Sequence, residues 1–440
     1  MATTRAEMAR KVGERLWRNA RRVRRALPRK NRFVIYLSVL GPGIIAANAG
    51  NDASGIATYS SVGAKYGYTL IWILIPILIS LAIVQEMCAR MGVVTGKGLA
   101  DLIREQFGVR WTTLVMLALF IANGGVIVSE FVGIAAASEL FGLSRYVTVP
   151  VTAFGVWWLV VKGTQKRVER VFLAMSLVFL CYIVSAFLAK PSWGEVGREL
   201  VRPSFGFDSS YLFMVVALIG TTITPFMQVF VQSSVVEKGL SEDDYAIARA
   251  DVIVGTVFAV LIAFFIVVST AATLHVTGVT EIETAADAAQ SLEPVAGKYA
   301  RYLFAIGLFG AAMLAMGVLP LATAYSISEA LGFEKGLSRS FREAPIFLSI
   351  FTFLIVAGAV VAMIPGLPQI HLLLVTQCMN GMLLPVILIA ITRLVNNREL
   401  MGDYVNGKIF NIFAWTITII VSCLSVSLLL ETIFPKLLSR

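Results

Sequence analysis

Charged residues are scarce in this sequence: they make up 15% of 440 residues, whereas 58% of the residues are hydrophobic. Soluble globular proteins carry about 25% charged residues, so this composition excludes an ordinary soluble domain. The apolar runs are long enough for helices of about 20 residues, and they lack the alternating pattern of an outer-membrane barrel. We therefore predict an all-α integral membrane protein that crosses the bilayer many times.

Residues that commonly build enzyme sites are also few. The chain has no His-Glu-x-x-His, Gly-x-Ser-x-Gly or phosphate-loop motif, so we expect neither enzyme activity nor a cofactor. Its two histidines, His275 and His371, fall near predicted outer helix ends, where we expect them to face solvent. The cysteines lie in or beside apolar segments without paired spacing, which predicts neither disulfides nor a thiolate metal site; they are Cys88, Cys181, Cys378 and Cys423.

Much of the net charge of +10 is concentrated in residues 1–32, where many Lys and Arg stand against Glu7 and Glu14 only. The apolar run that follows is too long for a signal peptide. Basic segments beside a membrane usually set orientation, so we predict that this one lies at the cytoplasmic face near anionic lipid, and we expect no nucleic-acid partner.

Hydropathy in windows of about 19 residues predicts eleven membrane spans. They run near residues 33–62, 68–92, 112–141, 144–161, 168–189, 211–238, 246–276, 301–331, 346–364, 369–395 and 411–433. Basic residues favour the loops on the side of the N-terminus, whereas the loop after the seventh span is acidic, with Glu281, Glu283, Asp287 and Glu293. The positive-inside rule then predicts a cytoplasmic N-terminus and an extracytoplasmic Arg440.

Two of these spans contain residues that interrupt a helix. The first holds the run from Asn48 to Gly55, in which Gly, Asn and Asp weaken the helix. Its Asp52 is a carboxylate at bilayer depth, which costs roughly 3 kcal/mol and normally faces a cavity and a partner. The sixth span holds Pro225 after Thr224, with Gly220 one turn earlier.

Interrupted helices at matching places in two halves point to an inverted-repeat transporter with a site at the midplane. Freed carbonyls beside Asp52 favour a cation site, although a kinked helix whose Asp52 is satisfied by a neighbouring backbone group stays open.

The ordered series of motifs resembles the Nramp divalent-metal transporters over about residues 33–430. The motifs are Gly41-Pro42-Gly43, Asp52-Ala53-Ser54-Gly55, Gly67 to Leu70, Ala89 to Gly92, Thr95 to Ala100, Ser129 to Gly133, Gly220 to Pro225, Gln377 to Pro385 and Met401 to Asn406. The resemblance implies a LeuT-like fold with helices 1 and 6 unwound at the midplane. It implies two inverted five-helix repeats over 33–190 and 211–395, an extracellular linker at 191–210, and a loop and an eleventh helix in 396–440.

Departures from the family pattern decide the expected ion. Gly55 stands where the family has a metal-binding Asn, and Thr224-Pro225-Phe226 replaces Met-Pro-His. Loss of the thioether favours a hard ion, and Gly55 is expected to empty space beside Asp52 for an ion that keeps its waters. This pattern is similar to the Nramp-related magnesium transporters, and it predicts Mg²⁺ as substrate, with Mn²⁺ as a further candidate.

Within that resemblance we expect Asp52 to be the charged partner of the ion and Thr224 to offer a hydroxyl. Backbone carbonyls of Ala49 and Thr221 would complete the set, and Ser54 is a weaker candidate. Gln377 and Asn380 are spaced to face the same cavity, or else to join two helices by hydrogen bonds.

Proton coupling is not expected, because Phe226 and Ile127 stand where proton-coupled relatives carry His and an acid. Glu130 is either a residual proton site or a buried acid bonded to another helix. The resulting hypothesis is an uncoupled, monomeric uniporter that works by alternating access in a bacterial inner membrane. A proton-coupled Mn²⁺/Fe²⁺ transporter is the first alternative; a carrier of an organic substrate, or a channel, is less favoured.

Overall fold

The computed structural model describes residues 41–433, except 207, 283–284, 291–299 and 338. Nine helical segments in these residues are long and apolar enough to cross a membrane. The predicted basic segment 1–32, the start of the first span, Glu283, Glu293 and Arg440 lie outside the described residues.

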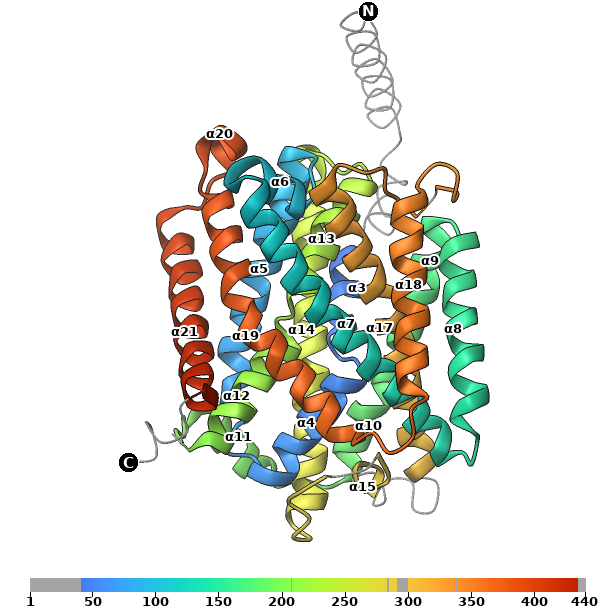
Figure 1. Ribbon diagram of the computed structural model, residues 1–440. Coiled ribbons are helices and arrows are strands. Elements are labelled where there is room, and N and C mark those ends of the chain that lie inside the picture. The colour runs from blue at the N-terminus through green and yellow to red at the C-terminus, as the bar shows by residue number, and fades with distance from the viewer. Residues whose placement is uncertain (1–40, 207, 283–284, 291–299, 338, 434–440) are drawn as a thin grey trace, which may run out of the picture. The chain divides into compact units, whose positions relative to one another are not determined.

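The helices follow the predicted spans closely (Figure 1). The bounds, in chain order, are α3 Pro42–Ala49, α4 Ala53–Tyr66, α5 Leu74–Thr95, α6 Leu99–Phe107, α7 Val109–Leu140, α8 Arg145–Lys162, α9 Gln165–Ser176, α10 Leu180–Leu188, α11 Trp193–Val201, α12 Ser209–Thr222, α13 Pro225–Glu237, α14 Tyr245–Thr270, α15 Ala285–Gln290, α17 Ala300–Leu331, α18 Pro345–Ala362, α19 Gln369–Val395, α20 Arg398–Met401 and α21 Lys408–Ile433. The fifth predicted span is built from α9 and α10, and the predicted linker at 191–210 contains α11.

The first span opens where the sequence predicts. Helix α3 ends at Ala49, residues 50–52 form the first break, and α4 begins at Ala53. Asp52 has extended backbone and caps α4, because its side chain accepts from the backbone N–H of Gly55. An acid is therefore held at a helix start, where unpaired N–H groups favour negative charge.

The sixth span opens as well. Helix α12 ends at Thr222, residues 223–224 form the second break, and α13 begins at Pro225. Proline suits a first helical position because its missing N–H has no partner there, and Thr224 before it takes extended backbone.

Glycine backbones let the broken helices pack closely against their neighbours. A Cβ placed on Gly220 would lie 2.2 Å from the carbonyl oxygen of Gln377, so α12 touches the backbone of α19. On the other side, a Cβ on Gly43 would lie 2.6 Å from Cα of Val252 on α14. Small residues at crossings are the usual means by which membrane helices approach one another. The two breaks are thus enclosed by α5, α7, α14 and α19.

Different short helices lie at the two ends of the helix bundle. In Figure 1, α6 and α20 lie at the upper end, whereas α11 and α15 lie at the lower end. Helices such as α8 and α21 expose large apolar side chains, including Val151, Phe154, Ile412 and Phe413, as expected for a surface that contacts lipid. We refer to the two ends below as the α6 end and the α11 end.

Candidate functional site

Asp52 is the centre of the candidate site, and its side chain is fully buried. Its Oδ1 accepts from the backbone N–H of Gly55 at 2.5 Å. Gln377 donates through Nε2 to Oδ1 and Oδ2, each at 3.3 Å. The interpretation that a neighbouring backbone group satisfies Asp52 therefore holds for one of its oxygens, and an amide from α19 contacts both.

Helix α19 supplies two of the predicted residues together. Asn380 lies one turn after Gln377 and donates through Nδ2 to Gln377 Oε1 at 3.0 Å. The sequence left open whether these amides face the cavity or join helices, and Gln377 does join α19 to Asp52. Asn380 Oδ1, in contrast, is buried and has no hydrogen-bond partner among the described residues.

The second break adds hydroxyl oxygens from α12 and from the start of α13. The side chains of Thr221 and Thr224 are fully buried, and in the described part of the chain their Oγ1 atoms have no hydrogen-bond partner. A Cβ on Gly55 would lie 3.0 Å from Oγ1 of Thr221. A Cβ on Gly50 would lie 3.1 Å from the carbonyl oxygen of Thr221. Thr221 thus faces the first break with both oxygens, whereas the sequence predicted only its carbonyl.

Three other predicted residues border the breaks without offering a free side-chain oxygen. Ala49 ends α3 and is fully buried, and Phe226 is buried beside Pro225 at the start of α13. The hydroxyl of Ser54 contacts Ser129 Oγ at 2.8 Å and donates to Glu130 Oε1 at 2.9 Å.

Gly55 does not leave the free space that the sequence argument expected. A Cβ at this position would lie 2.6 Å from the carbonyl oxygen of Gly50 and 3.1 Å from Asp52 Oδ1. That prediction is wrong because the Gly50 carbonyl oxygen occupies the place where a side chain at position 55 would begin. Glycine here permits a close approach of backbone to backbone.

Met227 is a residue that sequence reasoning missed. Its methyl group lies so close to Gly50 that a Cβ there would be 1.8 Å from Met227 Cε. Its sulfur is 3.8 Å from Nε2 of Gln85 on α5. The start of α13 thus brings a thioether side chain against the first break, with its methyl group toward Gly50 and its sulfur in contact with Gln85. The place of Met227 three residues after Thr224 was the available signal.

Glu130 on α7 is bound by the start of α4. Its carboxylate accepts from the backbone N–H of Ala53 at 2.9 Å and of Ser54 at 3.3 Å, and from the Ser54 hydroxyl. Thr376 on α19 donates to Ser129 Oγ at 3.3 Å, which extends this chain of contacts to the turn that holds Gln377. The arrangement matches the interpretation of Glu130 as a buried acid bonded to another helix.

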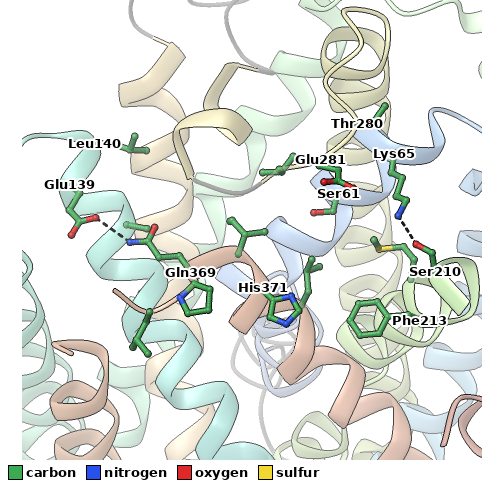
Figure 2. Close-up of a pocket in the computed structure, with 17 residues that line it drawn as sticks. Ser61, Lys65, Glu139, Leu140, Ser210, Phe213, Thr280, Glu281, Gln369 and His371 are labelled. Carbon is green, nitrogen blue, oxygen red and sulfur yellow. Dashed lines mark hydrogen bonds between the residues drawn. The ribbon is translucent and has the colours of Figure 1, made fainter. Parts of the chain in front are cut away.

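A cavity of about 1010 Å³ is lined by the ends of α4 and α7 and the starts of α12 and α19, all at the α11 end. Figure 2 shows the side chains that line it. Its polar lining includes Lys65, Glu139, Glu281 and His371, and Lys65 donates to Ser210 Oγ at 2.5 Å. Leu374 also lines it, one turn before Gln377 on α19. The cavity therefore ends near the candidate site, while Asp52 itself remains covered.

The α6 end is closed by polar contacts between helices. Glu329 on α17 accepts from Ser233 Oγ of α13 at 2.7 Å and from the backbone N–H of Ala100 on α6 at 3.3 Å. Lys335 pairs with Glu329 at 3.1 Å and with Asp101 at 2.7 Å. The described residues thus form a cavity toward the α11 end and polar contacts between helices at the α6 end.

Comparison with known proteins gives consistent results. The family model described as "Natural resistance-associated macrophage protein-like" (Nramp) matches residues 43–431. The divalent metal cation transporter MntH of Deinococcus radiodurans is 26% identical over 406 residues, which are 90% of each chain. The MntH of Pectobacterium carotovorum is 27% identical over 412 residues, covering 90% of this chain and 95% of the other.

Two solved structures share the fold. The manganese transporter of Eremococcus coleocola, in complex with an aromatic bis-isothiourea compound, has a TM-score of 0.73 at 16% identity, covering 93% of this chain and 90% of the other. MhsT in complex with L-phenylalanine has a TM-score of 0.57 at 15% identity, covering 88% and 98%. These likenesses confirm the predicted LeuT-like, all-α membrane fold. With the family match over nearly all described residues, the chain belongs to the Nramp family.

Proposed function

We propose that this chain is a secondary transporter of divalent metal ions that carries Mg²⁺ by alternating access, as a member of the Nramp-related magnesium transporter branch. The coarse part of this proposal is supported by its relatives, which are named as divalent metal cation transporters. The choice of ion depends on the donors at the two breaks.

The observation that carries the proposal is a set of buried oxygens at the two breaks and on α19, with the Asp52 carboxylate among them. Asp52 offers charge, and Thr221, Thr224 and Asn380 offer side-chain oxygens that have no partner among the described residues. Carboxylate, hydroxyl and amide oxygens suit Mg²⁺, whereas thioether ligands favour softer ions. One charged ligand is also typical for Mg²⁺, which keeps several of its waters.

Residues near the two breaks also favour transport of the ion without a coupled proton. Phe226 and Ile127 cannot titrate, and both are fully buried. The Glu130 carboxylate accepts three hydrogen bonds from the start of α4, so it joins α7 to α4. A divalent ion entering an inside-negative cell gains about 4.6 kcal/mol per 100 mV, twice the value for a single charge, so no proton gradient is needed.

A proton-coupled Mn²⁺/Fe²⁺ transporter is the second candidate, and Met227 is the observation that favours it. Its thioether lies against Gly50 in the first break. Thioether sulfur is a ligand that selects transition metals over Mg²⁺. In this structure Gln85 contacts that sulfur, so we keep Mg²⁺ as the first candidate.

Proteoliposomes loaded with one dye for Mg²⁺ and one for pH test the proposal, with Mn²⁺ as competitor. We expect saturable Mg²⁺ entry without acidification. Entry of Mn²⁺ with acidification and without Mg²⁺ flux would establish the second candidate. Flux that does not saturate would instead indicate a channel.

We place this activity in a bacterial inner membrane, because the relatives are bacterial. The cytoplasmic N-terminus, its contact with anionic lipid, the extracytoplasmic C-terminus and the monomeric state remain parts of the proposal. In that topology the cavity beside Lys65 and His371 opens to the outside.

A further inference from the structure

A column of buried amide side chains leads from the second break toward the α6 end. Gln228 and Gln232 lie one and two turns after Thr224 on α13, so all three side chains share one face of that helix. Together they cover about 12 Å along the helix axis. Gln232 donates through Nε2 to the carbonyl oxygen of Lys97 at 2.9 Å. Lys97 is exposed just after the end of α5, so the fully buried Gln232 is bonded to the backbone of a surface residue.

The column is lined by oxygens that lack partners. Oε1 of Gln228 and Gln232, Oε1 of Gln85 on α5, and Oδ1 of Asn48 on α3 are buried without a hydrogen-bond partner in the part of the chain that the structure describes. All four side chains are fully buried. An unsatisfied buried acceptor costs about 1–3 kcal/mol, so these four oxygens on adjacent helices would be stabilised by water or by the waters of a hydrated ion.

Met227 lies at the end of this column nearest the candidate site, and it separates the two. It lies between Gly50 of the first break and Gln85, with its methyl group against Gly50 and its sulfur 3.8 Å from Gln85 Nε2. Methionine is unbranched and has three rotatable bonds, so it can leave such a position without a change in the helix that carries it.

We propose that Asn48, Gln85, Gln228 and Gln232 form the exit path for a hydrated divalent cation, with Met227 as its plug in this conformation. This inference rests on the proposed function. The amide oxygens accept hydrogen bonds from the waters around the ion, and they carry no charge that would hold it. Passage requires sites that bind well enough to admit an ion and weakly enough to release it.

The first test is transport by a Gln228→Leu, Gln232→Leu variant in proteoliposomes, with MgCl₂ as substrate. We expect the maximal rate to fall tenfold or more, because each typical hydrogen bond lost from the rate-limiting step slows it by about fivefold and the variant removes two amides. The Mg²⁺ concentration for half-maximal uptake should change by less than about twofold, because ground-state binding at Asp52 is untouched.

The matched control is Thr256→Val. Thr256 on α14 is also fully buried with a partnerless hydroxyl, but it does not belong to the column. Its removal should leave uptake unchanged. An equal loss of rate in both variants, or an unchanged rate in the double variant, overturns the exit path.

A second test does not depend on which ion is carried. A Gln232→Cys variant of the full chain should react with a membrane-impermeant thiol reagent applied at the α6 end, and adding Met227→Ala should speed the labelling of a Gln228→Cys variant. The unaltered chain is the control for its own cysteines. Absence of labelling at both positions, with and without MgCl₂, overturns the path. If the unaltered chain carries no Mg²⁺ but both cysteines react, the proposed function fails and the path stands.

Discussion

Gln377 donates through one nitrogen to both carboxylate oxygens of Asp52, at 3.3 Å each. Asp52 also caps α4, with Oδ1 2.5 Å from the backbone nitrogen of Gly55. One residue therefore links the start of a half-helix to α19, which lines the cavity one turn away. An ion that binds the carboxylate would compete with these donors, and this gives binding a direct effect on how α4 and α19 contact each other.

Asp52→Ala should abolish divalent-ion uptake, because Asp52 supplies the formal charge at the first break. Loss of its cap alone would cost only about 1 kcal/mol of stability. Asp208→Ala is the matched control, since Asp208 caps α12 by accepting from Tyr211 at 3.1 Å. Uptake in proteoliposomes should persist in that variant. Near-normal uptake by Asp52→Ala would remove the site from the first break.

The sequence predicted both breaks because Gly, Asn and Pro act on the local backbone, and the structure confirms them at residues 50–52 and 223–224. It also identified Asp52, Gln377 and Asn380, which share one chain of hydrogen bonds. It could not predict the crowding at Gly55 or the approach of Met227 to Gly50, since both depend on how closely two helices pack and on their rotation. Spacing along one helix carries no such information.

Gly55→Asn should therefore reduce uptake strongly, and should not simply shift selectivity. Its Cβ would lie 2.6 Å from the Gly50 carbonyl oxygen, a distance that forces the backbone at the first break to move. Gly55→Ala, which adds only that Cβ, should already lower the uptake rate. Uptake by Gly55→Ala equal to that of the unaltered chain would indicate that the break relaxes freely.

Thr224→Met tests selectivity at the second break without that clash. The Thr224 hydroxyl has no hydrogen-bond partner among the described residues, so its removal breaks no bond that they form. A thioether at this position should raise the preference for Mn²⁺ over Mg²⁺, measured by competition in the two-dye assay. Thr222→Val, whose hydroxyl bonds Tyr59 and the Leu218 carbonyl, is the control outside the expected ligand set. An unchanged Mn²⁺/Mg²⁺ ratio would assign selectivity to residues further out.

Glu130→Gln should destabilise the protein while uptake stays free of proton flux. The amide replaces one acceptor oxygen that faces N–H and O–H donors of Ala53 and Ser54, a loss of about 1–3 kcal/mol in the free energy of unfolding. Glu139→Gln, on the same helix but exposed, should have little effect. Unfolding in detergent and the pH dye measure the two quantities. Unchanged stability with an altered pH dependence of uptake would instead make Glu130 a proton site.

Lys335 should stabilise the closed α6 end at neutral pH and lose that effect in strong alkali. Burial alone would lower its pKa, but the carboxylates of Glu329 and Asp101 outweigh burial and raise the pKa above 10.5. A raised pKa in the folded state stabilises that state below the unfolded value of about 10.4, and the gain disappears as the pH rises through the folded pKa. The free energy of unfolding should thus be flat from neutral pH to about pH 10 and fall above it.

Lys335→Met should have a lower free energy of unfolding at neutral pH, because Glu329 is fully buried and loses its counter-charge. Its difference from the unaltered chain should shrink above about pH 10. Lys97→Met, which breaks a surface pair with Glu105 that is worth about 0–1 kcal/mol, is the control. An equal effect of both variants would mean that the α6 end gains nothing from burying the charge of Glu329 beside Lys335.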